Sequence, residues 1–248
     1  MKKYEMTSNV KEFLGHKLFQ IKALKDFGDV KAGDLGGYIE KEENLSHDGI
    51  AWVFDNAWVY DNAKIICNAQ IFDNAQVYGD TCICGDAWVF GDARVYDNAR
   101  VSDHAEVCGK AQIYGNAQIC GYAGVFGEAK VFDRAQVFDR AQVFDGARIY
   151  GDARVYGETW IRNNAWIFNY AQISNNVDYI CFGGFGSENG NITMFRTKNK
   201  NVFVYCDCFR GSLKEFKEKV KETYGSNIYA KEYLACIEVA KIHFQIED

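Results

Sequence analysis

The central part of the chain repeats a pattern of apolar and polar residues with a period of six. Valine or isoleucine occupies every sixth position from Val53 to Ile173, which makes 21 consecutive hexads. The position two before each of them is almost always alanine, and the position two after it is nearly always glycine, aspartate or asparagine. Residues two apart point to the same side of a strand. The pattern therefore predicts short strands with an apolar inner side, separated by tight corners.

Hexads of this kind are typical of a parallel β-helix with a triangular cross-section. Three hexads close one coil, so residues 51–176 predict about seven coils. At roughly 4.8 Å per strand, the coils stack into a prism on the order of 30 Å tall. The corners require a left-handed backbone conformation, which Gly, Asp and Asn adopt readily. We name the three flat sides by their first aliphatic residue: the Val53 face, the Val59 face and the Ile65 face.

The sequence on either side of the repeat does not follow this period. Residues 1–50 contain short stretches with strand character, at 4–7, 17–24 and 36–40, and we expect them to form a β cap over the first coil. Residues 177–248 predict a small α+β domain, with strands at 177–182, 191–198 and 201–209. Ser212 followed by Glu215 is a capping box that opens a helix, and a second helix is expected over 228–244.

Side chains next to the aliphatic positions point outward and form columns, because hexads three apart lie above one another. The column on the Val53 face is rich in phenylalanine: Phe54, Phe72, Phe90, Phe126 and Phe144. Such a column is too apolar to leave in water, so we expect a partner subunit of a homotrimer, or a terminal segment, to cover it. The column on the Val59 face is mostly tyrosine, which tolerates a half-wet groove. Stacked rings also simply stabilise neighbouring strands.

Charged residues are sorted between corners and flat faces. The formal net charge is −6, and every acidic residue of the repeat except Glu106 lies at a corner. Seven basic residues lie on the flat faces instead: Lys64, Arg94, Arg100, Lys130, Arg148, Arg154 and Arg162. Flat faces of this composition can attract anions. Lysine and arginine beside a strand are equally common as solubilising residues.

Cations and rings interleave on the Val59 face, and this strip is our candidate ligand site: Arg94, Tyr96, Tyr114, Lys130, Phe132, Arg148 and Tyr150. Rings can stack on a base and arginine forks bind phosphate oxygens, so the ligand expected is small, anionic and nucleotide-like. A single face is shallow, so a neighbouring subunit or the C-terminal domain must supply a second wall. Arg196, Arg210 and Ser212 are further candidates, the last two because a helix N-terminus offers free N–H groups to an anion.

The repeat resembles the hexapeptide-repeat family, which implies a left-handed helix. The C-terminal unit resembles a small domain that closes many hexapeptide-repeat proteins of bacteriophages and prophages. The matching residues are Gly186, Ser187, Asn189, Phe195, Arg196, Thr197, Cys208, Phe209, Gly211, Leu213, Phe216, Tyr229 and Tyr233, together with the phrase GDLGGYIE at 33–40. The resemblance implies a small viral accessory protein, a class in which host-defence antagonists that sequester nucleotide signals are common.

Two other functions compete with ligand sequestration. Many hexapeptide-repeat trimers are acyltransferases, but those enzymes usually carry a catalytic histidine and a loop extruded from a coil. The hexads here have no insertion, and their one histidine, His104, lies at a corner. The sequence therefore favours a non-catalytic protein. The second competitor is a structural or protein-binding scaffold of a virion, although globular caps at both ends argue against an extended fibre.

Apolar segments and cysteines in the sequence indicate the cellular compartment and the cofactors to expect. The first residues lack the apolar core of a signal peptide and no apolar run is long enough to span a membrane, so we expect a cytoplasmic protein. Five of the nine cysteines occupy outward or corner positions, which favours reduced thiols. The pairs Cys82 with Cys84 and Cys206 with Cys208 have no histidine at metal-ligand spacing. We expect no metal, no other cofactor and no long nucleic acid partner.

Overall fold

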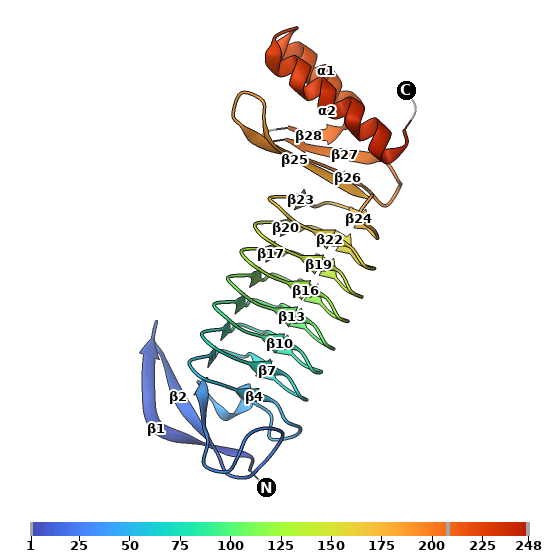
Figure 1. Ribbon diagram of the computed structural model, residues 1–248. Coiled ribbons are helices and arrows are strands. Elements are labelled where there is room, and N and C mark those ends of the chain that lie inside the picture. Colours follow the sequence, from blue (N-terminus) through green and yellow to red (C-terminus); the bar gives the residue numbers. More distant parts are fainter. Residues whose placement is uncertain (1, 207–208, 247–248) are drawn as a thin grey trace.

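The computed structural model describes residues 2–206 and 209–246, so Cys208 lies outside the described residues. The chain forms a long solenoid with a β cap on its first coil and a small α+β unit on its last (Figure 1). The mainly β fold predicted from the hexads is confirmed. No helix in the described residues is both long and apolar enough to cross a membrane.

Each face of the solenoid is a parallel sheet whose two-residue strands come from every third hexad. The strands of the Val53 face are β4 (Trp52–Val53), β7 (Gln70–Ile71), β10 (Trp88–Val89), β13 (Glu106–Val107), β16 (Gly124–Val125), β19 (Gln142–Val143) and β22 (Trp160–Ile161). Those of the Val59 face are β5 (Trp58–Val59), β8 (Gln76–Val77), β11 (Arg94–Val95), β14 (Gln112–Ile113), β17 (Lys130–Val131), β20 (Arg148–Ile149) and β23 (Trp166–Ile167). Those of the Ile65 face are β6 (Lys64–Ile65), β9 (Cys82–Ile83), β12 (Arg100–Val101), β15 (Gln118–Ile119), β18 (Gln136–Val137), β21 (Arg154–Val155) and β24 (Gln172–Ile173).

The N-terminal segment adds most of an eighth turn, one more than the hexads predict. A hairpin of β1 (Tyr4–Phe13) and β2 (His16–Ala23) pairs with β3 (Leu35–Ile39), and β3 pairs in parallel with β5. After a 3₁₀ turn (Glu42–Asn44), Leu45 forms a parallel bridge to Ile65. The difference arises because backbone pairing does not require the hexad sequence. Residues 35–46 lack the hexads, yet they pair with the first strands of the Val59 and Ile65 faces.

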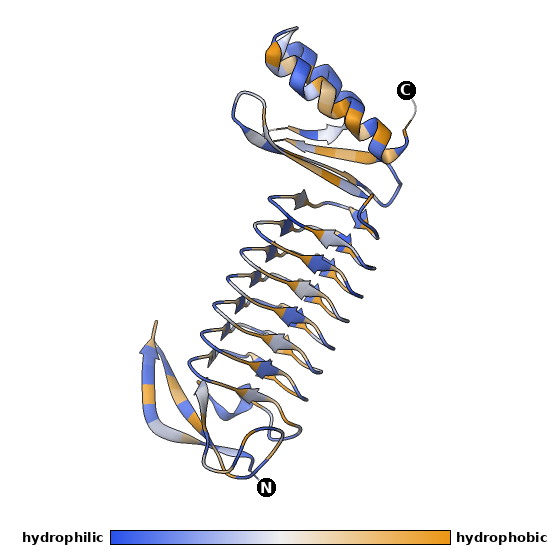
Figure 2. Ribbon diagram, viewed as in Figure 1, coloured by the Kyte–Doolittle hydropathy of each residue, from blue (hydrophilic) through white to orange (hydrophobic). Residues whose placement is uncertain are grey.

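The core of the solenoid is a single column of aliphatic and alanine side chains. All 21 valines and isoleucines of the hexads, and the alanines two before them, are fully buried. Apolar and polar residues accordingly alternate along every coil in Figure 2. Thr81 and Thr159 replace alanine in two hexads, and their hydroxyls donate to the carbonyls of Tyr78 and Tyr156, at 2.9 and 2.7 Å. Each buried valine or isoleucine contributes about 1.5–3 kcal/mol.

The corners explain why aspartate is so frequent in the repeat. The aspartates two after an aliphatic residue adopt the left-handed backbone that the turn requires, for example Asp97 with a φ of 60°. Their carboxylates then accept a hydrogen bond from the corner amide one coil further on. Asp97 accepts from the Gly115 amide and Asp103 from the Gly121 amide, both at 3.0 Å. A corner aspartate therefore serves both as a turn residue and as a link between coils.

The C-terminal unit is an antiparallel sheet covered on one side by two helices. Its strands are β25 (Tyr179–Phe185), β26 (Gly190–Arg196), β27 (Val202–Cys206) and β28 (Phe209–Ser212), and its helices are α1 (Leu213–Tyr224) and α2 (Ile228–Phe244). Both helices lie where the sequence predicts them, and the capping box of Ser212 and Glu215 is present. The single strand expected over 201–209 is divided, with β27 and β28 pairing antiparallel.

This unit closes the open end of the last coil. The indole of Trp166 stacks on the ring of Tyr205, with 4.7 Å between centroids, and the Trp166 amide donates to the Thr193 hydroxyl at 3.1 Å. Phe168, also buried, packs edge-on against Phe195 and Phe203. The sheet thus covers the exposed core and satisfies a backbone donor at the end of the Val59 ladder.

Candidate anion-binding face

The tyrosine column of the Val59 face is one continuous stack of seven rings. Neighbouring centroids are 4.8–5.1 Å apart and neighbouring planes differ by at most 14°, for the rings of Tyr60, Tyr78, Tyr96, Tyr114, Phe132, Tyr150 and Phe168. Each ring already contacts its neighbours through both faces. A base cannot enter between rings at this spacing, so the column offers a ligand only ring edges and hydroxyl groups. The stacking mode expected from the sequence has no place between these rings.

Both ends of the column are covered by other parts of the chain. At the first coil, Phe13 and His16 from the hairpin lie 6.3 and 5.0 Å from the ring of Tyr60, which is buried. At the last coil, Phe168 is buried against the C-terminal sheet. The rings from Tyr78 to Tyr150 are only half-buried, but the hydroxyl of Tyr150 is itself buried. The accessible part of the Val59 face is therefore its middle, between two raised ends.

Tyrosine hydroxyls in this middle stretch are held protonated. Partial burial, reinforced by the neighbouring Tyr114 and Tyr78 rings, raises the pKa of Tyr96 to about 12. Burial also raises the pKa of Tyr78 and of Tyr114 above the ordinary value. The positive charge of Arg94 acts in the opposite direction and lowers the pKa of both Tyr78 and Tyr96. At neutral pH the face therefore presents O–H donors and cations together.

The cations of the Val59 face differ from those at the corners in having no acidic partner. Corner cations pair with an acid one coil further on: Lys110 with Glu128 at 3.6 Å, Arg134 with Asp152 at 2.7 Å and Arg140 with Glu158 at 3.5 Å. Among the described residues, no carboxylate lies within ion-pair distance of the candidates on the flat face, Arg94, Lys130 and Arg148. The guanidinium of Arg148 stacks instead on Trp166, 4.5 Å from the ring centroid.

A shallow polar hollow lies beside Arg94. Its volume is about 360 Å³ and its lining is entirely polar: Asn74, Gln76, Asp92, Arg94, Lys110 and Gln112. Asp92 accepts a hydrogen bond from the side-chain amide of Asn74 at 3.2 Å, and Lys110 is paired with Glu128. Among the residues that the structure describes, Arg94 is the cation of this lining that has no acidic partner. It lies beside the Asp92 carboxylate and is flanked by two glutamine amides that can donate.

The three candidates in the C-terminal unit do not form one site. Arg196 donates to the carbonyls of Lys200 and Phe244, at 3.0 and 2.5 Å, and lies 3.8 Å from Asp178, so it ties the end of α2 to the sheet. The amide and hydroxyl of Ser212 both donate to the Glu215 carboxylate at 2.7 Å. The Glu215 carboxylate therefore occupies both donors of Ser212, and the Ser212 hydroxyl in turn accepts from the Glu215 amide at 3.3 Å.

The side chain of Arg210 contacts the last ring of the Val59 column. Its guanidinium is 5.3 Å from the ring centroid of Phe168 and 5.5 Å from that of Tyr205. Tyr150 is half-buried, and although burial raises its pKa, the charge of Arg210 opposes this. Arg210 therefore extends the cationic side of the ring column toward the C-terminal unit. This connection crosses two domains and could not be found from the hexads.

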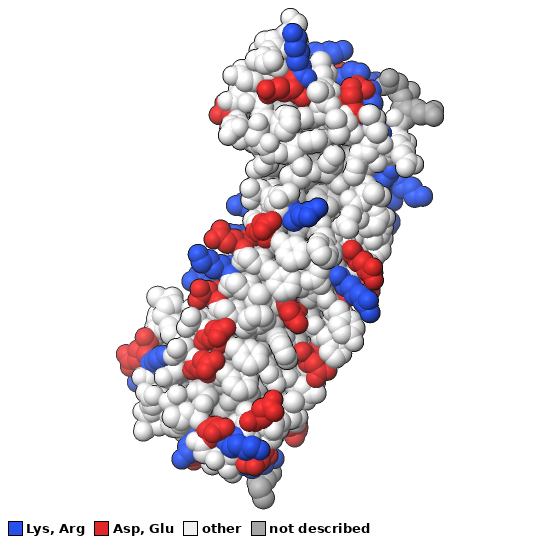
Figure 3. All heavy atoms as spheres, in the orientation of Figure 1, with Lys and Arg blue, Asp and Glu red and all other residues white. Residues whose placement is uncertain are grey.

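The Val53 face is the apolar counterpart of this charged side. Phe54 stacks on Phe72 at 4.7 Å and Phe126 on Phe144 at 5.4 Å, and the predicted phenylalanine column is half-buried. Figure 3 shows this side, where charged residues lie mainly along the two margins of a largely uncharged band. Two large indoles that our sequence analysis did not single out also lie here, Trp88 and Trp160, 45 % and 53 % exposed. Both tryptophans occupy an outward position of the hexad, and this position could have identified them as exposed from the sequence.

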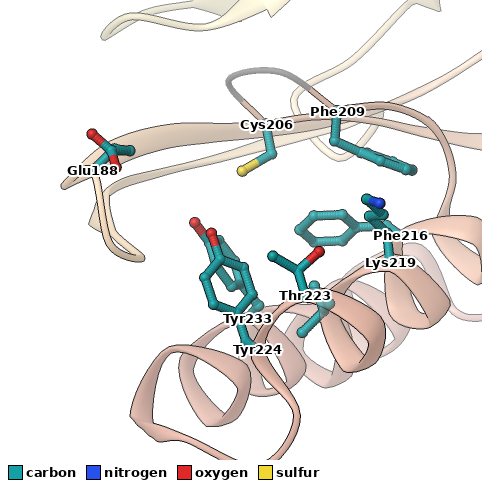
Figure 4. Close-up of a pocket in the computed structure, with 9 residues that line it drawn as sticks. Glu188, Cys206, Phe209, Phe216, Lys219, Thr223, Tyr224 and Tyr233 are labelled. Carbon is teal, nitrogen blue, oxygen red and sulfur yellow. The ribbon is translucent and has the colours of Figure 1, made fainter.

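A small apolar pocket lies inside the C-terminal unit, between its sheet and the helices. Its volume is about 150 Å³, and its lining includes Cys206, Phe209, Phe216 and Tyr233. Figure 4 shows aromatic rings from both helices turned toward the strands. These residues also pack together in the core of the unit. The pocket is too small for a nucleotide, and it is separate from the Val59 face.

Comparison with known families agrees with the fold. A family model described as YdcK Beta solenoid repeat matches residues 93–109 and 147–163. Each match spans nearly one coil, and both begin at an alanine that precedes a strand of the Val59 face, three coils apart. No curated protein matches the chain. The match supports a repeat β-solenoid and concerns a small part of the sequence.

Proposed function

We propose that the protein is a non-catalytic β-solenoid that binds a small phosphorylated ligand on its Val59 face. One observation supports this most directly: within the described part of the chain, no carboxylate pairs with the cations of this face, whereas the corner cations are paired. Unpaired arginines beside neutral O–H donors suit an anion with several acceptor oxygens. The hollow beside Arg94 is a place on this face where binding can begin.

The ring geometry narrows the chemistry of the ligand. Because the rings stack on one another, recognition rests on phosphate or carboxylate oxygens, and a base or other group contacts ring edges from outside. A phosphorylated nucleotide meets these requirements, and sequestration of such a signal by a phage-type accessory protein is part of our proposal. That wider role rests on the resemblance of the C-terminal unit and is associational.

The experiment compares flat-face and corner arginines with two probes, inorganic pyrophosphate and ATP, by isothermal titration calorimetry. We expect Arg94→Ala to weaken binding of both probes about tenfold or more, since a hydrogen bond to a charged group contributes about 1.5–3 kcal/mol. Arg148 lies three coils from Arg94, so we expect Arg148→Ala to weaken binding of the longer probe, ATP, and to leave binding of pyrophosphate unchanged. Arg134→Ala removes the same charge from a paired corner residue and serves as the control. Equal affinity in the parent and both flat-face variants would place the ligand elsewhere and leave the cations as solubilising residues.

A second candidate function, a self-assembling or protein-binding scaffold, is favoured by the exposed indoles of the Val53 face. A flat, nearly uncharged side with Trp88 and Trp160 half-exposed is typical of a surface that another protein covers. We propose that the occupant is a second copy of this chain in a homotrimer. Copies aligned along the solenoid axis have the same rise per coil, so side chains of neighbouring copies keep the same register along the whole face.

The assembly proposal is tested by the double variant Phe72→Glu with Phe90→Glu. We expect a fall from trimer to monomer mass in light scattering, because two charges would be buried in an apolar contact. Gln118→Glu with Gln136→Glu adds the same charge to the Ile65 face and is the control. If the Phe72/Phe90 variant keeps the parent's mass in solution, the Val53 face is not the contact between copies.

The acyltransferase alternative gains no supporting observation. The described coils between residues 52 and 173 pair in an unbroken register of 18 and contain no extruded loop. His104 is exposed at a corner, where it stacks on Tyr122 at 4.7 Å and lies 3.7 Å from Asp86.

A further inference from the structure

Three potential metal ligands converge where the N-terminal hairpin meets the first coil. His16 is the first residue of β2, Glu40 directly follows β3, and Asp61 lies at a corner of the solenoid. One ligand atom from each lies within 4.8 Å of the others. The side chains are 28 %, 27 % and 36 % exposed, so an ion can reach them from solvent while they remain held by the fold.

Hydrogen bonds fix the orientation of the imidazole. Nδ1 of His16 lies 2.8 Å from Oε1 of Glu40, and this contact assigns the proton of the neutral ring to Nδ1. Nε2 then carries the free lone pair, 3.7 Å from Oδ1 of Asp61. The ring also packs at a tilt on Tyr60, with centroids 5.0 Å apart. A carboxylate that orients a histidine in this way is the usual outer shell of a protein metal site.

The two carboxylates are positioned by backbone amides. Oε2 of Glu40 accepts from the Asp61 amide at 2.7 Å, and Oδ2 of Asp61 accepts from the Gly79 amide at 3.2 Å. These bonds use Oε2 of Glu40 and Oδ2 of Asp61, and Oδ1 of Asp61 faces Nε2 of His16 instead.

We propose that His16 and Asp61 bind a divalent transition metal, with Glu40 as the carboxylate that orients the histidine. Metal bonds of about 2.0–2.2 Å to nitrogen and oxygen fit the separation of 3.7 Å between Nε2 and Oδ1. Water completes the coordination, and a nitrogen and oxygen ligand set suits Zn²⁺ or Co²⁺. Because the ligands come from the hairpin and from the solenoid, the ion clamps one to the other.

The test uses Co²⁺ as the probe, because its absorption spectrum distinguishes thiolate ligands from nitrogen and oxygen ligands. The chain has four histidines, so imidazole resonances can be followed one by one during the titration. We expect one equivalent of Co²⁺ to broaden the His16 resonance first, with no thiolate band. Bound metal should also slow proteolysis at the hairpin tip, where Leu14 is highly exposed.

Variants separate this site from other histidines. His16→Gln and Asp61→Asn should each lower Co²⁺ affinity at least tenfold, and Asn retains the left-handed corner backbone that Asp61 adopts. His104→Gln is the matched control, because Nδ1 of His104 also lies 3.7 Å from a corner aspartate, Asp86, but at an exposed position. The proposal is overturned if folded His16→Gln binds Co²⁺ as the parent does, if binding gives a thiolate spectrum, or if millimolar Co²⁺ does not bind.

Discussion

The corner aspartates make a quantitative prediction, which we develop for Asp97. This residue has a left-handed φ of 60°, and its carboxylate accepts from the Gly115 amide of the next coil at 3.0 Å. Replacing it changes two separable quantities, the cost of the left-handed backbone and the bond between coils. Three substitutions, to Asn, Gly and Ala, alter them in different combinations.

The expected losses in the free energy of unfolding follow from these two quantities. Asp97→Ala loses the hydrogen bond, about 1 kcal/mol at an exposed site, and adds about 1–2 kcal/mol for a left-handed alanine. Asp97→Gly loses the same bond but avoids the steric cost, adding only about 0.5–1 kcal/mol of backbone entropy. Asp97→Asn keeps both the conformation and an acceptor oxygen, so we expect less than about 1 kcal/mol. The predicted order of stability is Asn, then Gly, then Ala.

Urea unfolding followed by tryptophan fluorescence measures this order, and hydrogen exchange of the Gly115 amide reports the bond itself. Exchange at this amide should quicken in the Gly and Ala variants and stay near the parent rate in the Asn variant. Because repeat arrays can unfold coil by coil, the exchange data identify which coils a variant loosens. The reasoning fails if Ala is as stable as Asn, or if the Gly115 amide exchanges equally in all variants.

Two further predictions concern the core and the ring column. Ile113→Ala, at a fully buried central position, should lower the free energy of unfolding by about 2–5 kcal/mol in the same urea assay. A loss below about 1 kcal/mol would mean that the core is not continuous at Ile113. In an absorbance titration, Tyr96 should ionise near its raised pKa of about 12 in the folded protein and near 10 in urea. Because the folded pKa is raised, the contribution of Tyr96 to stability is full below pH 10 and is lost as the pH rises toward 12. Ionisation of Tyr96 near pH 10 in the folded state would contradict the described packing.

The hexads predict most of the fold because each position of the repeat has one structural requirement. An aliphatic residue is buried, a small residue fits beside it, and a corner residue accepts a positive φ, so strands, faces and registers follow by counting from Val53. Counting fails at residues 35–46, where Leu45 and β3 join the ladder through backbone pairing without the repeat. The capping box and both C-terminal helices were predictable from local sequence.

The sequence predicts which face of the solenoid holds the candidate site, but it does not predict the side-chain contacts on that face. The hexads place Arg94 and Tyr96 on one side, yet whether a cation is paired depends on side-chain reach between coils. The near-parallel packing of successive rings, which excludes an inserted base, follows from the strand spacing and the ring rotamers together. Arg210 and the cluster around His16 involve segments outside the period, so no spacing rule connects them to the solenoid.

The central claim, that unpaired cations of the Val59 face bind a phosphorylated anion, is tested most directly by locating a heavy phosphate analogue on the protein. Crystals soaked in tungstate would show its position by anomalous scattering. We predict a peak in the hollow between Arg94 and Gln112, present in the parent and absent from Arg94→Ala. Peaks confined to corner cations such as Arg134, or a hollow that stays empty at saturating tungstate, would contradict the claim.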